Sequence, residues 1–189
     1  LPLSSGYSSI FTNVGSMENK GIEVSVNTVN LKLPDFTWST TFNYSFNKNK
    51  VLALSGGSDI YSGATVIRVG EPVGSFFGRV HLGTWSTNEA EEAKRFNMLP
   101  GDVKYLDLND DGVINDNDRT IIGKGIPDGY GTFLNTFQYK SWSLTVDLQY
   151  MYGNDVLDRS IHSLEDRQGI ANSYKTVLNA WTENNQNTP

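Results

Sequence analysis

The sequence has no cysteine, no run of basic residues and no long apolar stretch. Without cysteine, disulfide scaffolds, cysteine-ligated zinc, iron–sulfur clusters and thiol nucleophiles are excluded. The longest purely aliphatic stretches, such as Val51 to Leu54, are about four residues, whereas a membrane helix needs about 20. Because 15 Lys and Arg stand against 21 Asp and Glu, nucleic-acid binding through a basic face is disfavoured.

Apolar residues make up 38% of the 189 residues and charged residues 19%, both low for a soluble globular protein. Aromatic residues reach 12%, which is too many for a disordered tail. The first residues, Leu1 to Gly6, lack the charged start and apolar core of a signal peptide. We therefore expect the interior of a longer chain, including at the polar end around Pro189.

Two segments alternate strictly between apolar and polar residues. In Phe36 to Phe46 the even positions are aromatic apart from Thr40, and Trp142 to Tyr152 repeats the same period. Period-two alternation predicts strands with one apolar face. A weaker run precedes each of them, Gly21 to Asn30 and Tyr130 to Tyr139, and short connectors predict two antiparallel β-hairpins.

The hairpins divide the chain. We predict a first hairpin over residues 20–46, a long loop over 47–129, a second hairpin over 130–152 and an incomplete loop over 153–189. Both long segments then emerge on the same side, opposite the short turns. Strands of about 10 residues with short turns on one rim and long loops on the other are typical of outer-membrane β-barrels.

Aromatic residues gather at both strand ends, as two interfacial girdles require. Toward the tight turns lie Trp38, Tyr139 and Trp142; toward the long loops lie Tyr44, Phe46, Tyr130, Tyr150 and Tyr152. The prediction is an all-β fold: part of an antiparallel transmembrane β-barrel with long extracellular loops that contain short helices. A soluble antiparallel sheet with one face on a core would produce the same alternation. Four strands cannot close a barrel.

The polar positions of the same strands would line the lumen of such a barrel. They are Thr37, Ser39, Thr41, Asn43, Thr145, Asp147 and Gln149.

The segment Asp107 to Asp118 matches the D-x-[DN]-x-[DN]-G pattern of an EF-hand loop. Gly112 permits the sharp turn, and oxygen-only ligands favour calcium over magnesium. We predict a structural Ca²⁺ site with weak affinity, because Asp118 is one methylene shorter than the usual Glu. The alternative is a chain of turns in which Asp and Asn satisfy local backbone groups. The predicted ligands are Asp107, Asn109, Asp111, Val113 through its carbonyl, Asn115 and Asp118.

Other segments carry weaker signals. Residues 87–96 have the caps and charges of a short surface helix, and Gly70 to Gly78 is typical of a turn series. The tail from Asp155 to Trp181 favours one or two amphipathic helices. His162 has Asp158 and Asp166 four residues to either side, which more often forms a solvated face than a site. Recognisable catalytic motifs are missing, so we predict that the chain is not an enzyme.

An ordered series of motifs resembles the SusC/RagA-type TonB-dependent outer-membrane transporters, in the C-terminal part of their barrel. Each motif is weak alone, and their order and spacing carry the resemblance. The series is Asn13-Val14-Gly15, Glu18 to Glu23, Gly70 to Gly78, Pro100 to Tyr105, Asp107 to Asp118 with Arg119, Ile122-Gly123, Pro127 and Tyr130-Gly131.

The resemblance implies a barrel of about 22 strands with a plugged lumen in the outer membrane, with its long loops outside the cell. It also implies a SusD-like surface lipoprotein as partner, energy supplied through TonB by parts this chain lacks, and import of oligosaccharides or, in some members, peptides. The rival hypothesis from another class is a secreted, calcium-stabilised β-sheet module that binds glycans, such as an adhesin domain.

Overall fold

The computed structural model describes residues 13–165, 172–186 and 188. Leu1 to Gly6, Asp166 and Pro189, on which parts of the sequence predictions fall, lie outside these residues. The chain divides into two compact units. The first contains the described residues up to Ser75 together with Lys124–Asp155, and the second contains Phe76–Gly123 and the described residues from Val156 onward.

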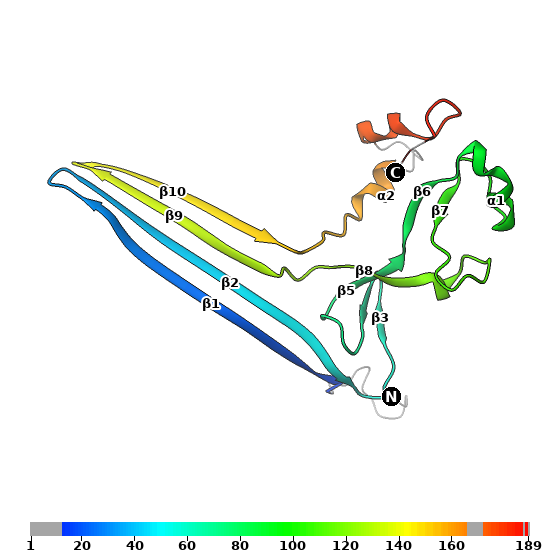
Figure 1. Cartoon of the computed structure of the whole chain (residues 1–189), viewed down its shortest axis with the longest axis horizontal. Helices are drawn as coiled ribbons and strands as arrows, with labels where there is room; N and C mark the ends of the chain where they lie inside the picture. Colours follow the sequence, from blue (N-terminus) through cyan, green and yellow to red (C-terminus); the bar gives the residue numbers. More distant parts are fainter. Residues whose placement is uncertain (1–12, 166–171, 187, 189) are drawn as a thin grey trace, which may run out of the picture. The chain divides into compact units, whose positions relative to one another are not determined.

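Four long strands form the main sheet of the first unit (Figure 1). Their order is β1-β2-β9-β10, and every neighbouring pair is antiparallel. The long connection between β2 and β9 therefore joins neighbouring strands, which pair the two predicted hairpins with each other. The strands are β1 (Gly15–Lys32), β2 (Phe36–Leu54), β9 (Gly129–Tyr139) and β10 (Trp142–Tyr152).

Short turns join the strands within each hairpin. The Leu33 backbone N–H donates to the Phe36 carbonyl at 2.7 Å in the first turn. Lys140 adopts a positive φ of 52° in the second, which gives the tight two-residue reversal. The Lys140 N–H also donates to the Asp35 carbonyl at 2.9 Å. The two turns therefore lie side by side at one end of the sheet.

The register places the alternating residues of all four strands on two opposite faces. Phe42 pairs with Val26 on one side and with Phe133 on the other, and Phe133 pairs with Leu148. Cross-strand partners project from the same face, so one face is apolar across the whole sheet. We call it the apolar face and the opposite one, which carries Asn43, the polar face.

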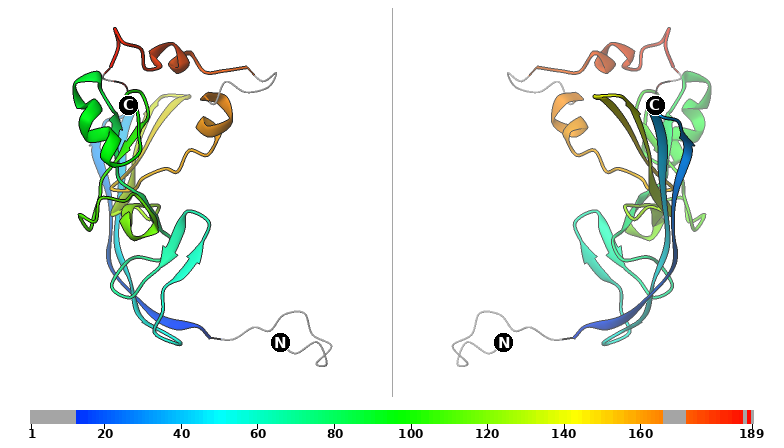
Figure 2. Two further views of the ribbon diagram at one scale, coloured as in Figure 1. Left: turned by 90° about the vertical axis from the view of Figure 1, so that its right-hand side faces the viewer. Right: turned by 90° about the vertical axis from the view of Figure 1, so that its left-hand side faces the viewer.

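The apolar face is not covered by a second layer among the described residues. Leu144 and Leu148 are 61% and 56% exposed, and Ile22 on β1 is 64% exposed. Phe42 and Tyr44 are half-buried. Figure 2 shows the strands from two further sides as a twisted sheet. The predicted all-β, antiparallel fold is confirmed: the described residues are mostly antiparallel β-structure, and their four long strands form an open sheet that does not close on itself.

Two details of the strands differ from the sequence predictions. β1 and β2 extend beyond residues 20–46, so the long connection begins after Leu54 rather than at Asn47. Tyr130 pairs with Ser45 and Met151, which places it on the polar face and outside the predicted aromatic girdle. The reason is parity, because Phe133 and Phe137 assign the odd positions of β9 to the apolar face.

The loop-side end of the polar face is covered by the segment that follows β2. This segment contains a small hairpin of β3 (Ile60–Ser62) and β4 (Thr65–Ile67). Val66 is fully buried and Val51 is 2% exposed. The Val73 N–H donates to the Asn49 side-chain oxygen at 2.8 Å, which fastens the segment onto β2.

The second unit holds the remaining strands and short helices. β6 (His81–Thr84) pairs with β7 (Val103–Tyr105), and β5 (Ser75–Arg79) neighbours β8 (Arg119–Lys124). The predicted helix over 87–96 is confirmed as η2 (Thr87–Glu89) and α1 (Ala90–Arg95). The other helical segments are η3 (Asp116–Asp118), α2 (Ser160–Glu165) and η4 (Lys175–Asn179). The turn series predicted over 70–78 ends at Gly74, because β5 begins at Ser75.

A small core anchors β6, β7 and α1. Trp85 is 3% exposed and stacks on Phe96 with ring centroids 5.9 Å apart. The Lys104 ammonium lies 4.2 Å from the centroid of the Trp85 ring. Ala93, on the inner face of α1, is fully buried. No helix within the described part of the chain is long and apolar enough to cross a membrane.

Candidate functional site

The polar face of the main sheet is a continuous array of hydrogen-bonding side chains. Asn43 accepts from the Ser25 hydroxyl at 2.7 Å and donates to Thr132 at 3.0 Å, so it links three strands. The Thr41 hydroxyl donates to Asn27 at 2.7 Å. The residues predicted to line a lumen lie together on this face: Thr37, Ser39, Thr41, Asn43, Thr145, Asp147 and Gln149.

A polar cluster also interrupts the apolar face. The Asn135 side-chain oxygen accepts from Trp38 Nε1 at 2.9 Å and from the Thr40 hydroxyl at 2.8 Å. Thr40 in turn accepts from the Asn30 amide at 2.5 Å. Asn135 is only 8% exposed, so an amide on this face is shielded and hydrogen-bonded. The interruption at Thr40 is visible in the sequence, but its partner Asn135 is identified only by the register.

The loop from Asp107 to Asp118 is organised around the buried carboxylate of Asp118. Asp118 is 1% exposed and accepts from the backbone N–H groups of Leu108 at 2.9 Å and Asn115 at 2.7 Å. The Asn115 N–H contributes most to holding the pKa of Asp118 below its usual range, because it stabilises the charged form. The two ends of the loop are thereby joined through one side chain.

The remaining predicted ligands also accept hydrogen bonds from nearby backbone N–H groups. Asp107 accepts from the Gly112 N–H at 2.7 Å and from the Asp111 N–H at 3.2 Å. Asp111 accepts from the Val113 N–H at 2.9 Å. Gly112 has a φ of 77°, the left-handed conformation that the motif requires of it.

Arg79 holds the loop from β5. Its Nε donates to the Asn115 carbonyl at 3.0 Å, and its guanidinium pairs with Asp116 at 3.1 Å. Arg119 lies over the Phe77 ring, with 4.8 Å between the guanidinium carbon and the ring centroid. The sequence analysis did not identify Arg79, because it lies 28 residues before the first predicted ligand and no local motif connects them.

The donor set suits calcium in type, since it consists of carboxylate, amide and carbonyl oxygens. In this structure the carboxylates are satisfied by backbone N–H groups, as in the alternative of a chain of turns. No group of three or more His, Asp or Glu side chains is placed to hold a metal ion in the described part of the chain. The calcium site therefore stays a prediction.

The histidines contribute little to a site. His81 lies beside Tyr105, with ring centroids 6.0 Å apart. The side chain of His162 and all of Asp166 lie outside the described residues, so their arrangement with Asp158 is not defined. Asp158 itself accepts hydrogen bonds from the Ser160 hydroxyl and N–H, and these hold its pKa below the usual range.

Comparison with curated proteins gives several relatives. The chain is 36% identical over 201 residues to the TonB-dependent receptor P3 of Formosa agariphila, covering all of this chain and 20% of that protein. It is 36% identical to the TonB-dependent receptor P26 of the same organism over 98% of the chain and 20% of the relative. The TonB-dependent receptor SusC of Bacteroides thetaiotaomicron is 27% identical over 82% of the chain and 16% of that protein. No family model matches the chain.

Solved structures of similar fold agree with these sequence relatives. The structure of the RagAB peptide transporter covers all of this chain and 21% of the solved chain, with a TM-score of 0.76 and 25% identity. The RagAB peptide importer in its open-open state gives a TM-score of 0.75, also at 25% identity.

These relatives are named receptors and transporters, which confirms the prediction that the chain is not an enzyme. The matches extend over both units, including the sheet and the Asp107–Asp118 loop. The motif order, the sheet and the relatives agree that the chain belongs to the SusC/RagA-type TonB-dependent receptors and forms part of their β-barrel.

Proposed function

We propose that this chain forms part of the barrel wall and extracellular mouth of an outer-membrane importer. The importer takes up oligosaccharides or peptides, is energised through TonB and works with a SusD-like surface lipoprotein. The chain spans about a fifth of the length of the curated relatives it matches, so this function belongs to the whole protein.

The observation that carries the proposal is the division of one sheet into an exposed apolar face and a hydrogen-bonded polar face. Leu148 and Leu144 are more than half exposed on the apolar face. On the polar face, the side chains of Asn43 and Thr132 form a hydrogen bond. In water, such an apolar face would need a covering layer. In a bilayer, hydrocarbon covers it, and the polar face lines the lumen.

The arrangement also favours the importer over the secreted adhesin module. A soluble module places its apolar face on a core of its own, and the described residues supply no such core for Leu144 or Ile22. No described strand pairs with the outer edge of β1 or of β10. Further strands of a barrel would satisfy both edges.

The proposal is tested with a deletion strain that lacks the full-length protein. Growth on individual oligosaccharides and on peptides as sole nutrient should fail for one class and return when the gene is restored. Affinity purification from the membrane fraction should recover a surface lipoprotein at a stoichiometric level. Unchanged growth on every nutrient, together with recovery of the protein in the soluble fraction, would overturn the proposal and support the adhesin.

A further inference from the structure

The apolar face ends in a group of lysines at the end of the sheet away from the tight turns. The register pairs Lys48 with Lys20, immediately beyond the Phe46 and Ile22 pair, and pairs Lys50 with Glu18. No irregularity of register falls between Phe46 and Lys50, so these side chains continue on the apolar face. We call Lys20, Lys48 and Lys50 the lysine rim.

The three lysines differ in the ion pairs that they form. Lys20 pairs with Glu18 at 2.9 Å. Lys48 and Lys50 make no ion pair with any described residue. Unpaired ammonium groups at the margin of a hydrocarbon-facing surface are placed to meet external anions.

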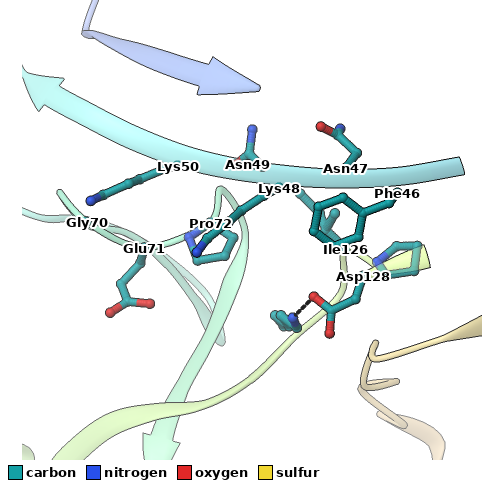
Figure 3. Close-up of a pocket in the computed structure, with 12 residues that line it drawn as sticks. Phe46, Asn47, Lys48, Asn49, Lys50, Gly70, Glu71, Pro72, Ile126 and Asp128 are labelled. Carbon is teal, nitrogen blue, oxygen red and sulfur yellow. Dashed lines mark hydrogen bonds and ion pairs between the residues drawn. The ribbon is translucent and has the colours of Figure 1, made fainter. Parts of the chain in front are cut away.

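A cavity of about 360 Å³ opens beside these two lysines (Figure 3). Phe46, Lys48 and Lys50 lie on one side of β2 in this view, and Asn47 and Asn49 lie on the other. The walls combine apolar and charged groups, and the further lining includes Pro72, Ile126, Glu71 and Asp128. Asp128 is neutralised by its ion pair with Lys124.

With Phe46 at the edge of the hydrocarbon, the height of Lys48 falls within a headgroup layer and that of Lys50 lies at its outer margin. A strand rises about 3.3 Å per residue, so Lys48 and Lys50 lie about 7 and 13 Å beyond Phe46 along the strand. With a strand tilt of about 45°, these become about 5 and 9 Å of height. The polar layer outside the hydrocarbon core is about 5 to 8 Å thick on each side.

We propose that the lysine rim and its cavity bind the phosphate of an anionic lipid headgroup, with Phe46 against the first part of the acyl chains. The inference rests on the proposed function, since it requires the apolar face to lie in a bilayer. Glu71 is the acid in the cavity without an ion pair among the described residues, and its charge opposes binding.

The test uses the full-length protein in detergent and titrates it with phosphatidylglycerol, read out by native mass spectrometry. The double variant Lys48→Gln, Lys50→Gln should bind the lipid about 30-fold more weakly. Lys94→Gln combined with Lys175→Gln removes the same charge outside the sheet and should bind as the parent does. Glu71→Gln should bind more tightly, a gain that misfolding cannot mimic.

Two results overturn the inference. One is equal lipid binding by the parent and the Lys48, Lys50 variant. The other is full displacement of the lipid by inorganic phosphate at equal concentration, because the site would then recognise free phosphate rather than a headgroup. Insertion of each variant into vesicles is measured in parallel. If the parent itself fails to insert, the proposed function fails, whereas insertion without lipid selectivity contradicts only the lysine rim.

Discussion

Individual side chains on the two faces of the sheet experience opposite surroundings. Leu148 and Thr145 are three residues apart on β10 but project from opposite faces, and both are exposed in this chain. Exposure alone therefore does not separate them. A substituted charge does, because hydrocarbon solvates it poorly and a wet lumen solvates it well.

Leu148→Arg should destabilise the full-length protein in lipid vesicles by about 2 to 4 kcal/mol if the residue lies near the midplane. Thr145→Arg should cost much less, since the lumen is polar. The free energy of unfolding is measured by urea titration of the folded protein in vesicles. Equal destabilisation by both substitutions would contradict the assignment of faces.

The second unit offers a pH test at a single carboxylate. Glu89 accepts from the Lys104 ammonium at 2.5 Å and from the N–H and hydroxyl of Ser86, which together hold its pKa at about 2. A depressed pKa contributes stability that is present above about pH 4.5 and is lost as the pH falls toward 2.

Glu89→Gln should therefore weaken the protection of α1 at pH 7, and its difference from the parent should shrink below pH 4.5. Amide hydrogen exchange of α1, corrected for intrinsic rates, provides the measurement. Glu92→Gln, within α1 and without an ion pair among the described residues, is the matched control. A difference between Glu89→Gln and the parent that is independent of pH would contradict the account.

Among secondary-structure elements, the loop around Asp118 makes a prediction of its own. Asp118→Asn keeps one acceptor oxygen but replaces the other with a donor, so either the Leu108 or the Asn115 N–H loses its partner. We expect faster proteolysis between Leu99 and Gly125. Asp110→Asn removes the same charge at a position with a φ of 57°, which Asn tolerates, and should leave cleavage unchanged. Equal cleavage of the two variants would contradict the role given to Asp118.

The same assay tests the predicted calcium site. If the motif holds an ion, Ca²⁺ should slow cleavage of this loop in the full-length protein relative to a chelator control, and Asp118→Asn should reduce that protection. Identical cleavage with Ca²⁺ and with the chelator would leave the loop as a chain of turns held by Asp118 and Arg79.

Strands were predictable from the sequence where side chains alternate strictly. β10 has the bounds of the run Trp142–Tyr152 because its apolar positions recur without interruption. The ends of β1 and β2 were missed because Asn47 to Lys50 are polar on both faces, so no apolar position marks the strand. Their alternation of Asn and Lys is itself a period of two, which becomes meaningful once pairing with β1 is known.

The contacts within the loops were harder to predict from the sequence than the strands. The Asp107–Asp118 motif identified a structured turn, but motif and turn chain share the same residues, so spacing could not separate ion binding from backbone bonding. Arg79 and Asn135 depend on contacts between distant segments. Only the folded arrangement brings such residues to their partners.

At the scale of the whole molecule, the account depends on what lies against the apolar face. Among the described residues, no second layer covers that face, and no strand pairs with the two outer edges of the sheet. Both features follow if the chain is one sector of a barrel in a bilayer. The absence of cysteine allows single cysteines to be placed in this sector without competing thiols from it.

The most direct test places a nitroxide spin label at Leu148→Cys and, separately, at Thr145→Cys in the full-length protein in bilayers. Collision rates with oxygen, which concentrates in hydrocarbon, are compared with those of a water-soluble nickel chelate. The account predicts that oxygen dominates at position 148 and the nickel chelate at position 145. Nickel access at position 148 equal to that at 145, or shielding of 148 from both reagents, would contradict it.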